Sequence, residues 1–307
     1  MISVFPEFSK LALADKDEYN QLVSEYPPYS DLSFTNLFIW WNLNDQLLVS
    51  QLNGNVVIKY SLPFDPEHSG EGLIGKHEID SSLQAIFEYQ KQHTLPQKLV
   101  NVPEFTLDEI QNRGQLEITE EADFNEYIMS SQQLAELSGG EHSRTRRKVA
   151  RFVRETGDLN VEVKSLDLNS EEVKKLLSAA VDEWSAKYPR PSDPQRVEDQ
   201  VLRKTLSLAS ELGTQNLALF VDGKLHGFTL YHPTPDGKYY ILNHMRVDYA
   251  LPHAFDYLTN QVALKAVENQ VPYINMEMDL GSEGLRHHKM GLRPVKFFKK
   301  YTIGLRP

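Results

Sequence analysis

Residues 217–248 read LALFVDGKLHGFTLYHPTPDGKYYILNHMRVD and carry the clearest secondary-structure pattern in the chain. Two alternating apolar runs, 217–221 and 225–231, flank Asp222-Gly223, a dipeptide typical of two-residue hairpin turns. A third run, 238–248, predicts a longer strand. The stretch therefore predicts three consecutive strands, the first two joined as a hairpin.

Helices and further strands are expected on both sides of these three strands. The N-terminal side predicts a strand over 159–166, a helix that starts at the capping-box pair Asn169 and Glu172 and reaches Trp184, and a helix from Asp193-Pro194 to Gly213. The C-terminal side predicts a helix from Pro252 to about Asn269, a strand over 273–279, a short helix over 283–290 and a last strand over 295–303.

The first half of the chain repeats this order more faintly. It predicts helices over 15–26 and 32–41, strands over 46–52 and 55–60 around Asn53-Gly54, a helix over 79–92, a strand over 98–102 and a short helix after Pro103. It shows no pattern for a long third strand. We therefore expect an α/β protein of two tandem domains, a degenerate one over 1–140 and a second over 157–307, joined by a basic helix over 141–156.

Composition is that of a globular protein with locally concentrated charge. The net charge is −11, yet 142–154 contains six basic residues and 285–307 contains seven, with no acid in either segment. Such segregation favours a local anion site on an acidic protein. The chain has no cysteine, the sequence predicts no signal peptide and no membrane span, and we expect a cytoplasmic location.

The segment 275–286, NMEMDLGSEGLR, contains the first candidate catalytic residues. Strand alternation would place Asn275, Glu277 and Asp279 on one face, at the carboxyl end of an interior strand, where ligands bind in open α/β sheets. Glu277 and Asp279 could clamp a substrate amine or remove a proton. Alternatively, they could form ion pairs with cations of the same domain and have only a structural role.

Several basic residues are candidate anion ligands. Arg286 and Lys289 are spaced to share a helix face, and Arg246 lies near the end of the third strand. They could bind phosphate or stabilise an oxyanion, or form ordinary ion pairs. The basic helix could follow the phosphates of a polyanion or be merely solvated; its candidate contacts are Arg144, Arg147, Lys148 and Arg151.

Other motifs exclude common chemistries. Gly70 to Gly75 matches G-x-G-x-x-G, but neighbouring acids would repel phosphate, so a flexible turn is the expectation. The stretch 247–252, VDYALP, lacks the glycine-rich turn that grips coenzyme A pyrophosphate, which weakens acyl-CoA as the donor. Adjacent His287-His288 is the closest approach to a metal-ligand spacing, and no metal is expected.

The element order and three segments resemble a known bacterial family. They are Ser33 to Trp40, the basic helix after Gly139-Gly140, and 275–289 with Tyr301 beyond it. The sequence resembles proteins that share the C-terminal catalytic domain type of phosphatidylglycerol lysyltransferase, a tandem GNAT-fold (N-acetyltransferase-like) family related in architecture to the Fem peptidyltransferases. The resemblance covers nearly the whole chain.

The resemblance implies transfer of an aminoacyl group from aminoacyl-tRNA, with site residues on the first helix, the third strand and the last helix. The matching positions are Glu183, Arg246 and Lys289. Asn243 departs from the family pattern, which has an acid there. A β-bulge would place Asn243 and Arg246 on one face of the strand.

The sequence therefore favours an acyl- or aminoacyltransferase with an amine or hydroxyl acceptor, and aminoacyl-tRNA over acyl-CoA as donor. Glu183, Glu277 or Asp279 would act as base or amine clamp, and Arg246, Arg286 and Lys289 would bind donor phosphate or the oxyanion. One alternative is a non-catalytic module that binds a small anionic or amino-acid ligand. Another is a nucleic-acid binder that uses an exposed basic helix.

Overall fold

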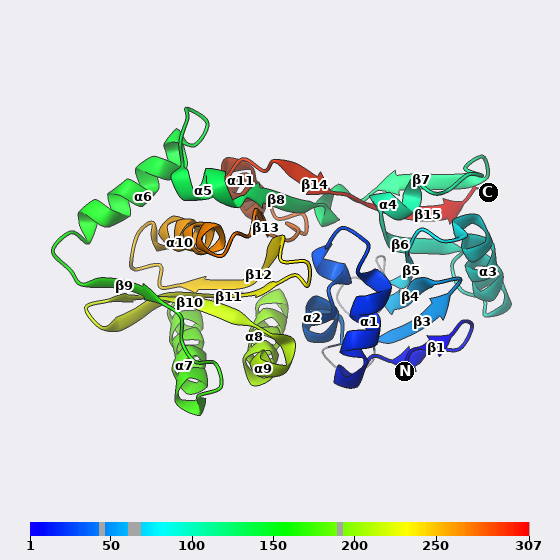
Figure 1. The fold of residues 1–307 in the computed structure, drawn as a ribbon, viewed down its shortest axis with the longest axis horizontal. Helices are drawn as coiled ribbons and strands as arrows, with labels where there is room; N and C mark the ends of the chain where they lie inside the picture. Colours follow the sequence, from blue (N-terminus) through cyan, green and yellow to red (C-terminus); the bar gives the residue numbers. More distant parts are fainter. Residues whose placement is uncertain (43–46, 61–68, 189–192, 307) are drawn as a thin grey trace. The chain divides into compact units, whose positions relative to one another are not determined.

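The computed structural model describes residues 1–42, 47–60, 69–188 and 193–306. They form two compact units. The N-terminal unit comprises Met1–Glu126, Met278–Ser282 and Phe297–Pro307, and the C-terminal unit comprises Tyr127–Glu277 and Glu283–Lys296. Each unit contains one mixed sheet covered by helices, as the sequence predicts (Figure 1).

The sheet of the N-terminal unit has the order β1-β3-β4-β5-β6-β15-β7, with β2 paired to β3. Its strands are β1 (Ser3–Val4), β2 (Ser9–Lys10), β3 (Leu48–Leu52), β4 (Asn55–Tyr60), β5 (Gly70–Ile74), β6 (Lys98–Pro103), β7 (Leu116–Glu120) and β15 (Lys300–Leu305). Its helices are α1 (Lys16–Val23), α2 (Phe34–Asn36), which continues into a π-helical turn over Leu37–Trp41, α3 (Ile79–Gln92) and α4 (Glu104–Leu107).

The sheet of the C-terminal unit has the order β14-β8-β13-β12-β11-β10-β9. Its strands are β8 (Glu126–Ser130), β9 (Val161–Lys164), β10 (Gln215–Val221), β11 (Lys224–Pro233), β12 (Tyr239–Val247), β13 (Tyr273–Asn275) and β14 (Lys296–Phe298). Its helices are α5 (Ser131–Glu136), α6 (Ser143–Glu155), α7 (Glu171–Lys187), α8 (Asp193–Ser207), α9 (Ala209–Leu212), α10 (Ala254–Glu268) and α11 (Glu283–Gly291).

Two apolar cores cover the two faces of this second sheet. On one face, α10 and α6 pack on residues of β10 to β13. On the other, α7 and α8 pack on Phe228 and Leu230 of β11 (Figure 1). Each face therefore has its own helices. The core in which a β12 side chain packs shows which face of the sheet it lies on.

Both predicted hairpins are confirmed. Asp222 and Gly223 have φ of 49° and 75°, and Asn53 and Gly54 have φ of 51° and 79°. Two successive residues of positive φ define the type I′ turn, whose twist matches that of the flanking strands. Asp-Gly and Asn-Gly adopt it at low cost because glycine and asparagine tolerate the left-handed region.

The G-x-G-x-x-G segment is a strand, so the expectation of a flexible turn is wrong. Gly70–Ile74 is β5, which pairs with β4 and β6 inside the first sheet. A Cβ on Gly72 would lie 2.6 Å from the Tyr60 ring and 2.9 Å from the Val100 carbonyl oxygen. Glu71, one of the acids expected to repel phosphate, is buried and accepts a hydrogen bond of 2.7 Å from Gln90 Nε2. Glycine here permits close packing of neighbouring strands.

The last predicted strand is two strands in different sheets. β14 joins the second sheet, whereas β15 pairs with β6 and β7 in the first. Phe297–Pro307 is part of the N-terminal unit, although its first two residues complete β14 of the second sheet. The basic helix α6 belongs wholly to the C-terminal unit. This division differs from the expected boundaries at 140 and 156. The helix cap also differs: Ser170, and not Asn169, caps α7.

Candidate functional site

A β-bulge in β12 shapes the candidate site. Leu230 pairs with His244 and Tyr231 pairs with Leu242, so Asn243 is the extra residue. Leu242 and Met245 both pack in the α10 core, and therefore Asn243 and His244 both face α7 and α8. Arg246 lies on that face too, where it contacts α8. The structure confirms the expectation that a bulge brings Asn243 and Arg246 to one face.

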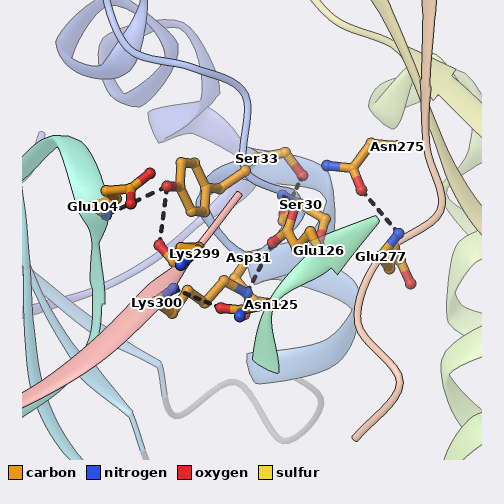
Figure 2. A network of polar contacts seen from close by, with 11 residues as sticks. Ser30, Asp31, Ser33, Glu104, Asn125, Glu126, Asn275, Glu277, Lys299 and Lys300 are labelled. Carbon is orange, nitrogen blue, oxygen red and sulfur yellow. Dashed lines mark hydrogen bonds and ion pairs between the residues drawn. The ribbon is translucent and has the colours of Figure 1, made fainter. Parts of the chain in front are cut away.

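The strands β12 and β13 part beside this bulge. They pair in parallel only between Tyr239–Ile241 and Tyr273–Asn275, while β12 continues to Val247. Just beyond β13, Glu277 has a φ of 58°, and its N–H donates to Asn275 Oδ1 over 2.8 Å (Figure 2). A left-handed residue at this point turns the chain out of the strand.

The Glu277 carboxylate is held by a chain of side chains. Asn243 Nδ2 donates to Glu277 Oε1 over 3.2 Å, and Asn243 Oδ1 lies 2.8 Å from His232 Nδ1. These two partners fix the orientation of the amide, because its oxygen accepts from an imidazole N–H and its nitrogen donates to a carboxylate. The half-buried Glu277 is thereby positioned as a hydrogen-bond acceptor where the two strands diverge.

The predicted acidic stripe is not formed. β13 ends at Asn275, so strand alternation does not extend to Glu277 and Asp279. Asp279 is fully buried in the N-terminal unit, where its Oδ1 accepts the Gly281 N–H over 2.9 Å. Glu277 belongs to the C-terminal unit. The cause is the left-handed backbone at Glu277, which residue types alone did not reveal.

Arg246 is engaged by two carboxylates of α8. Its Nη2 lies 2.9 Å from Glu198 Oε2 and 3.4 Å from Asp199 Oδ1. Arg246 and Glu198 line a pocket whose other walls include Trp184, Tyr188 and Tyr249. With two acids to one guanidinium, the formal charge of this cluster is negative.

The remaining predicted residues lie in different surroundings. Glu183 is exposed, 3.8 Å from Lys224. Arg286 is half-buried. Lys289 is buried, with its ammonium 5.7 Å from the centre of the Tyr127 ring, a cation–π distance.

The basic face of α6 is exposed on the C-terminal unit. Phe152 anchors the helix by stacking on Tyr257 of α10, with ring centres 4.2 Å apart. Lys148 bonds to Asp256 over 2.9 Å and is half-buried. The exposed cations are Arg144, Arg146, Arg147, Arg151 and Arg154. Val153, which follows Phe152 in the sequence, is exposed.

Sequence reasoning missed a buried ionic cluster in the N-terminal unit. The Lys300 ammonium contacts Asp31 and lies 2.8 Å from Glu126 Oε1, and all three side chains are buried (Figure 2). Glu126 Oε2 also accepts the Ser30 N–H over 2.7 Å, and Asn125 Oδ1 accepts the Lys300 N–H over 3.0 Å. These residues are far apart in the chain, so no local spacing pattern revealed them.

The charges of this cluster depend on one another. Burial raises the pKa of Asp31, an effect that the Lys300 ammonium opposes. Burial alone would lower the pKa of Lys300, but the carboxylates of Asp31 and Glu126 outweigh it and the pKa is raised. The lysine is therefore held as a cation between two buried acids, which is a structural role in the N-terminal unit.

The described residues contain neither a membrane-spanning helix nor a candidate metal site. No helix among them is both long and apolar enough to cross a membrane. No group of three or more histidine or acidic side chains in the same ranges could hold a metal ion.

Taken with the bulged β12 and its parting from β13, the two sheets define a tandem GNAT-fold protein of mixed α/β class. The chain belongs to the family described as phosphatidylglycerol lysyltransferase, C-terminal, which matches residues 24–304. None of the curated proteins matches the sequence.

Solved structures of the same fold cover nearly the whole chain. A conserved protein of unknown function from Bacteroides thetaiotaomicron is 23% identical, with a TM-score of 0.85 and full coverage of both chains. L-PGS from Bacillus licheniformis is 15% identical, with a TM-score of 0.61 over 99% of this chain and 94% of that one. FemX is 10% identical, with a TM-score of 0.56 over 98% and 97%. At these identities the likeness establishes the fold.

Proposed function

We propose that the protein transfers an aminoacyl group from aminoacyl-tRNA to an amine or hydroxyl acceptor, with Glu277 as the general base. The observation that carries this proposal is the Glu277 carboxylate, fixed by Asn243 where β12 and β13 part. Membership of the lysyltransferase family supports an acyl- or aminoacyltransferase activity. We place the reaction in the bacterial cytoplasm, where aminoacyl-tRNA is found.

In the proposed reaction, the acceptor nitrogen or oxygen attacks the ester carbonyl while Glu277 removes its proton. The tetrahedral intermediate then collapses, the ester C–O bond breaks, and the proton returns to the leaving ribose hydroxyl. Lys289 and Arg286 are the cations that we assign to the oxyanion. We assign proton transfer to Glu277 because Glu183 is exposed beside Lys224 and Asp279 is fully buried in the other unit.

The turn after β12 argues against coenzyme A as the donor carrier. Asp248 Oδ1 accepts the Ala250 N–H and the Asp248 carbonyl accepts the Leu251 N–H, both over 3.0 Å. Pro252 has no N–H. The turn thus offers few groups to a pyrophosphate, and Asp248 would repel one. The arginines of α6 suit an extended RNA backbone better.

A transfer assay with aminoacyl-tRNA and small amine acceptors tests the catalytic role. We expect Glu277→Gln to lower the transfer rate by about 10²–10⁴-fold, because the amide cannot accept the proton. Glu162→Gln, on the exposed part of β9, is the matched control and should keep wild-type activity. Equal activity of the Glu277 variant would rule out this residue as the base.

Binding measurements test the donor independently. We expect RNA affinity to fall steeply with salt, and the double reversal Arg147→Glu and Arg151→Glu to weaken it by at least about tenfold. The control variant Lys91→Glu and Lys238→Glu, at two exposed lysines, changes the net charge by the same amount and should lower RNA affinity much less. Tight stoichiometric coenzyme A binding by calorimetry, or no RNA binding at low salt, would refute the proposed donor.

The pocket of Trp184, Tyr188, Tyr249, Glu198 and Arg246 favours a second candidate function, a non-catalytic module for a small amino-acid ligand. Such a module would bind an amino acid in calorimetry without any transfer. Glu277→Gln would then leave that affinity unchanged.

A further inference from the structure

The helices α6 and α11 meet at an unusual pair of basic side chains. Arg144 Nη1 lies 3.1 Å from His287 Nε2, and both residues are exposed. A guanidinium has only donors, so this contact is a hydrogen bond only when Nε2 carries no proton. The geometry is therefore that of a neutral His287 imidazole, and a protonated one would face a second cation.

Cations outnumber acids on the elements that meet at His287. The basic residues are Arg144, Arg147 and Lys148 on α6 and Arg286, His288 and Lys289 on α11. The acids are Glu283, four residues before His287 on α11, and Asp256 on α10. Asp256 bonds to Lys148 over 2.9 Å. Burial lowers the pKa of His288, which Asp256 opposes and the nearby cations reinforce. Extra positive charge at this corner would therefore be stabilised best by a bound anion.

We propose that Arg144 and His287 form a two-helix clamp for a phosphate group of RNA, and that the clamp closes with uptake of a proton. The phosphate replaces the hydrogen bond between the two side chains. His287 then binds a proton at Nε2 and donates it in a hydrogen bond to a phosphate oxygen, while Arg144 donates from its guanidinium. This inference rests on the proposed function, which supplies RNA as the polyanion.

The direction of the effect follows from histidine chemistry. Histidine is the side chain whose charge responds to pH in the physiological range. If only the protonated form completes the clamp, RNA affinity rises as the pH falls from 7.5 to 5.5, and each binding event is coupled to proton uptake.

Calorimetry of a short RNA duplex with the whole chain tests the clamp. Titrations at pH 7.5 in two buffers of different ionisation enthalpy and equal ionic strength give the number of protons taken up. His287→Gln, which keeps a hydrogen-bonding side chain but cannot be protonated, should abolish most of this uptake and flatten the affinity between pH 5.5 and 7.5. His93→Gln, an exposed histidine in the N-terminal unit, is the matched control.

The outcomes separate this inference from the proposed function. If wild type and His287→Gln bind RNA with the same proton uptake, the clamp is wrong and the RNA partner stands. If wild type binds no RNA at either pH, the proposed donor fails and the clamp fails with it. Arg144→Gln should also lose the proton linkage, and unchanged linkage in that variant would overturn the pairing.

Discussion

Replacement of Lys300 by methionine should destabilise the N-terminal unit strongly. The substitution keeps the length of the buried side chain but removes the cation from between Asp31 and Glu126. At an effective dielectric constant of about 20, unit charges at the 2.8 Å separation of Lys300 and Glu126 attract by about 6 kcal/mol. Desolvation offsets part of this attraction, and stranding a buried charge costs about 3–5 kcal/mol.

Urea unfolding followed by circular dichroism measures this cost. We expect Lys300→Met to lower the free energy of unfolding by about 3–5 kcal/mol. The triple variant Lys300→Met, Asp31→Asn, Glu126→Gln should recover most of the loss, because no buried charge remains unpaired. A loss below about 1 kcal/mol, or no recovery in the triple variant, would refute the view that the cluster is held by compensated buried charge.

Two further predictions concern stability. Burial lowers the pKa of His244 from 6.5 to about 3, so the folded state binds fewer protons than the unfolded state below pH 6.5. The free energy of unfolding should therefore fall by up to about 1.4 kcal/mol for each pH unit of acidification between those values. His244→Gln should reduce that slope in urea unfolding measured at several pH values. Gly72→Ala should cost about 1–3 kcal/mol because its Cβ would approach the Val100 carbonyl within 2.9 Å. Gly114→Ala, with no atom within 4 Å of its Cβ, is the control for the glycine variant. Equal free energies of unfolding for the two variants would contradict the packing argument.

The parts of the fold that could be predicted depend on local chemistry. The two type I′ turns follow from Asn-Gly and Asp-Gly, and α3 has the predicted bounds because its apolar stripe has helical spacing. The strand β5 was missed because glycines usually signal a turn. Here Gly72 is needed because residues of the two neighbouring strands pack too closely for a Cβ, and the sequence does not show which strands are neighbours.

Non-local pairing explains the other failures. β15 continues directly from β14 in the chain, yet it pairs with β6, about 200 residues earlier. The Lys300 cluster joins residues separated by 269 and 174 positions, namely Asp31 and Glu126. No periodicity within a window can show such contacts, since they depend on which strands become neighbours.

The candidate site shows how one residue type can depart from a family pattern and still fit the geometry. Asn243 stands where the resemblance implies an acid, and its amide nitrogen lies 3.2 Å from Glu277 Oε1. A carboxylate in that position would face a second carboxylate, and the pair would hold a proton or a cationic group between them. The amide instead donates to Glu277 Oε1, and its oxygen lies 2.8 Å from His232 Nδ1, so it holds the Glu277 carboxylate by a hydrogen bond. A carboxylate held in this way beside the bulge is suited to accepting a proton from an acceptor amine or hydroxyl, which is why we assign the base to Glu277.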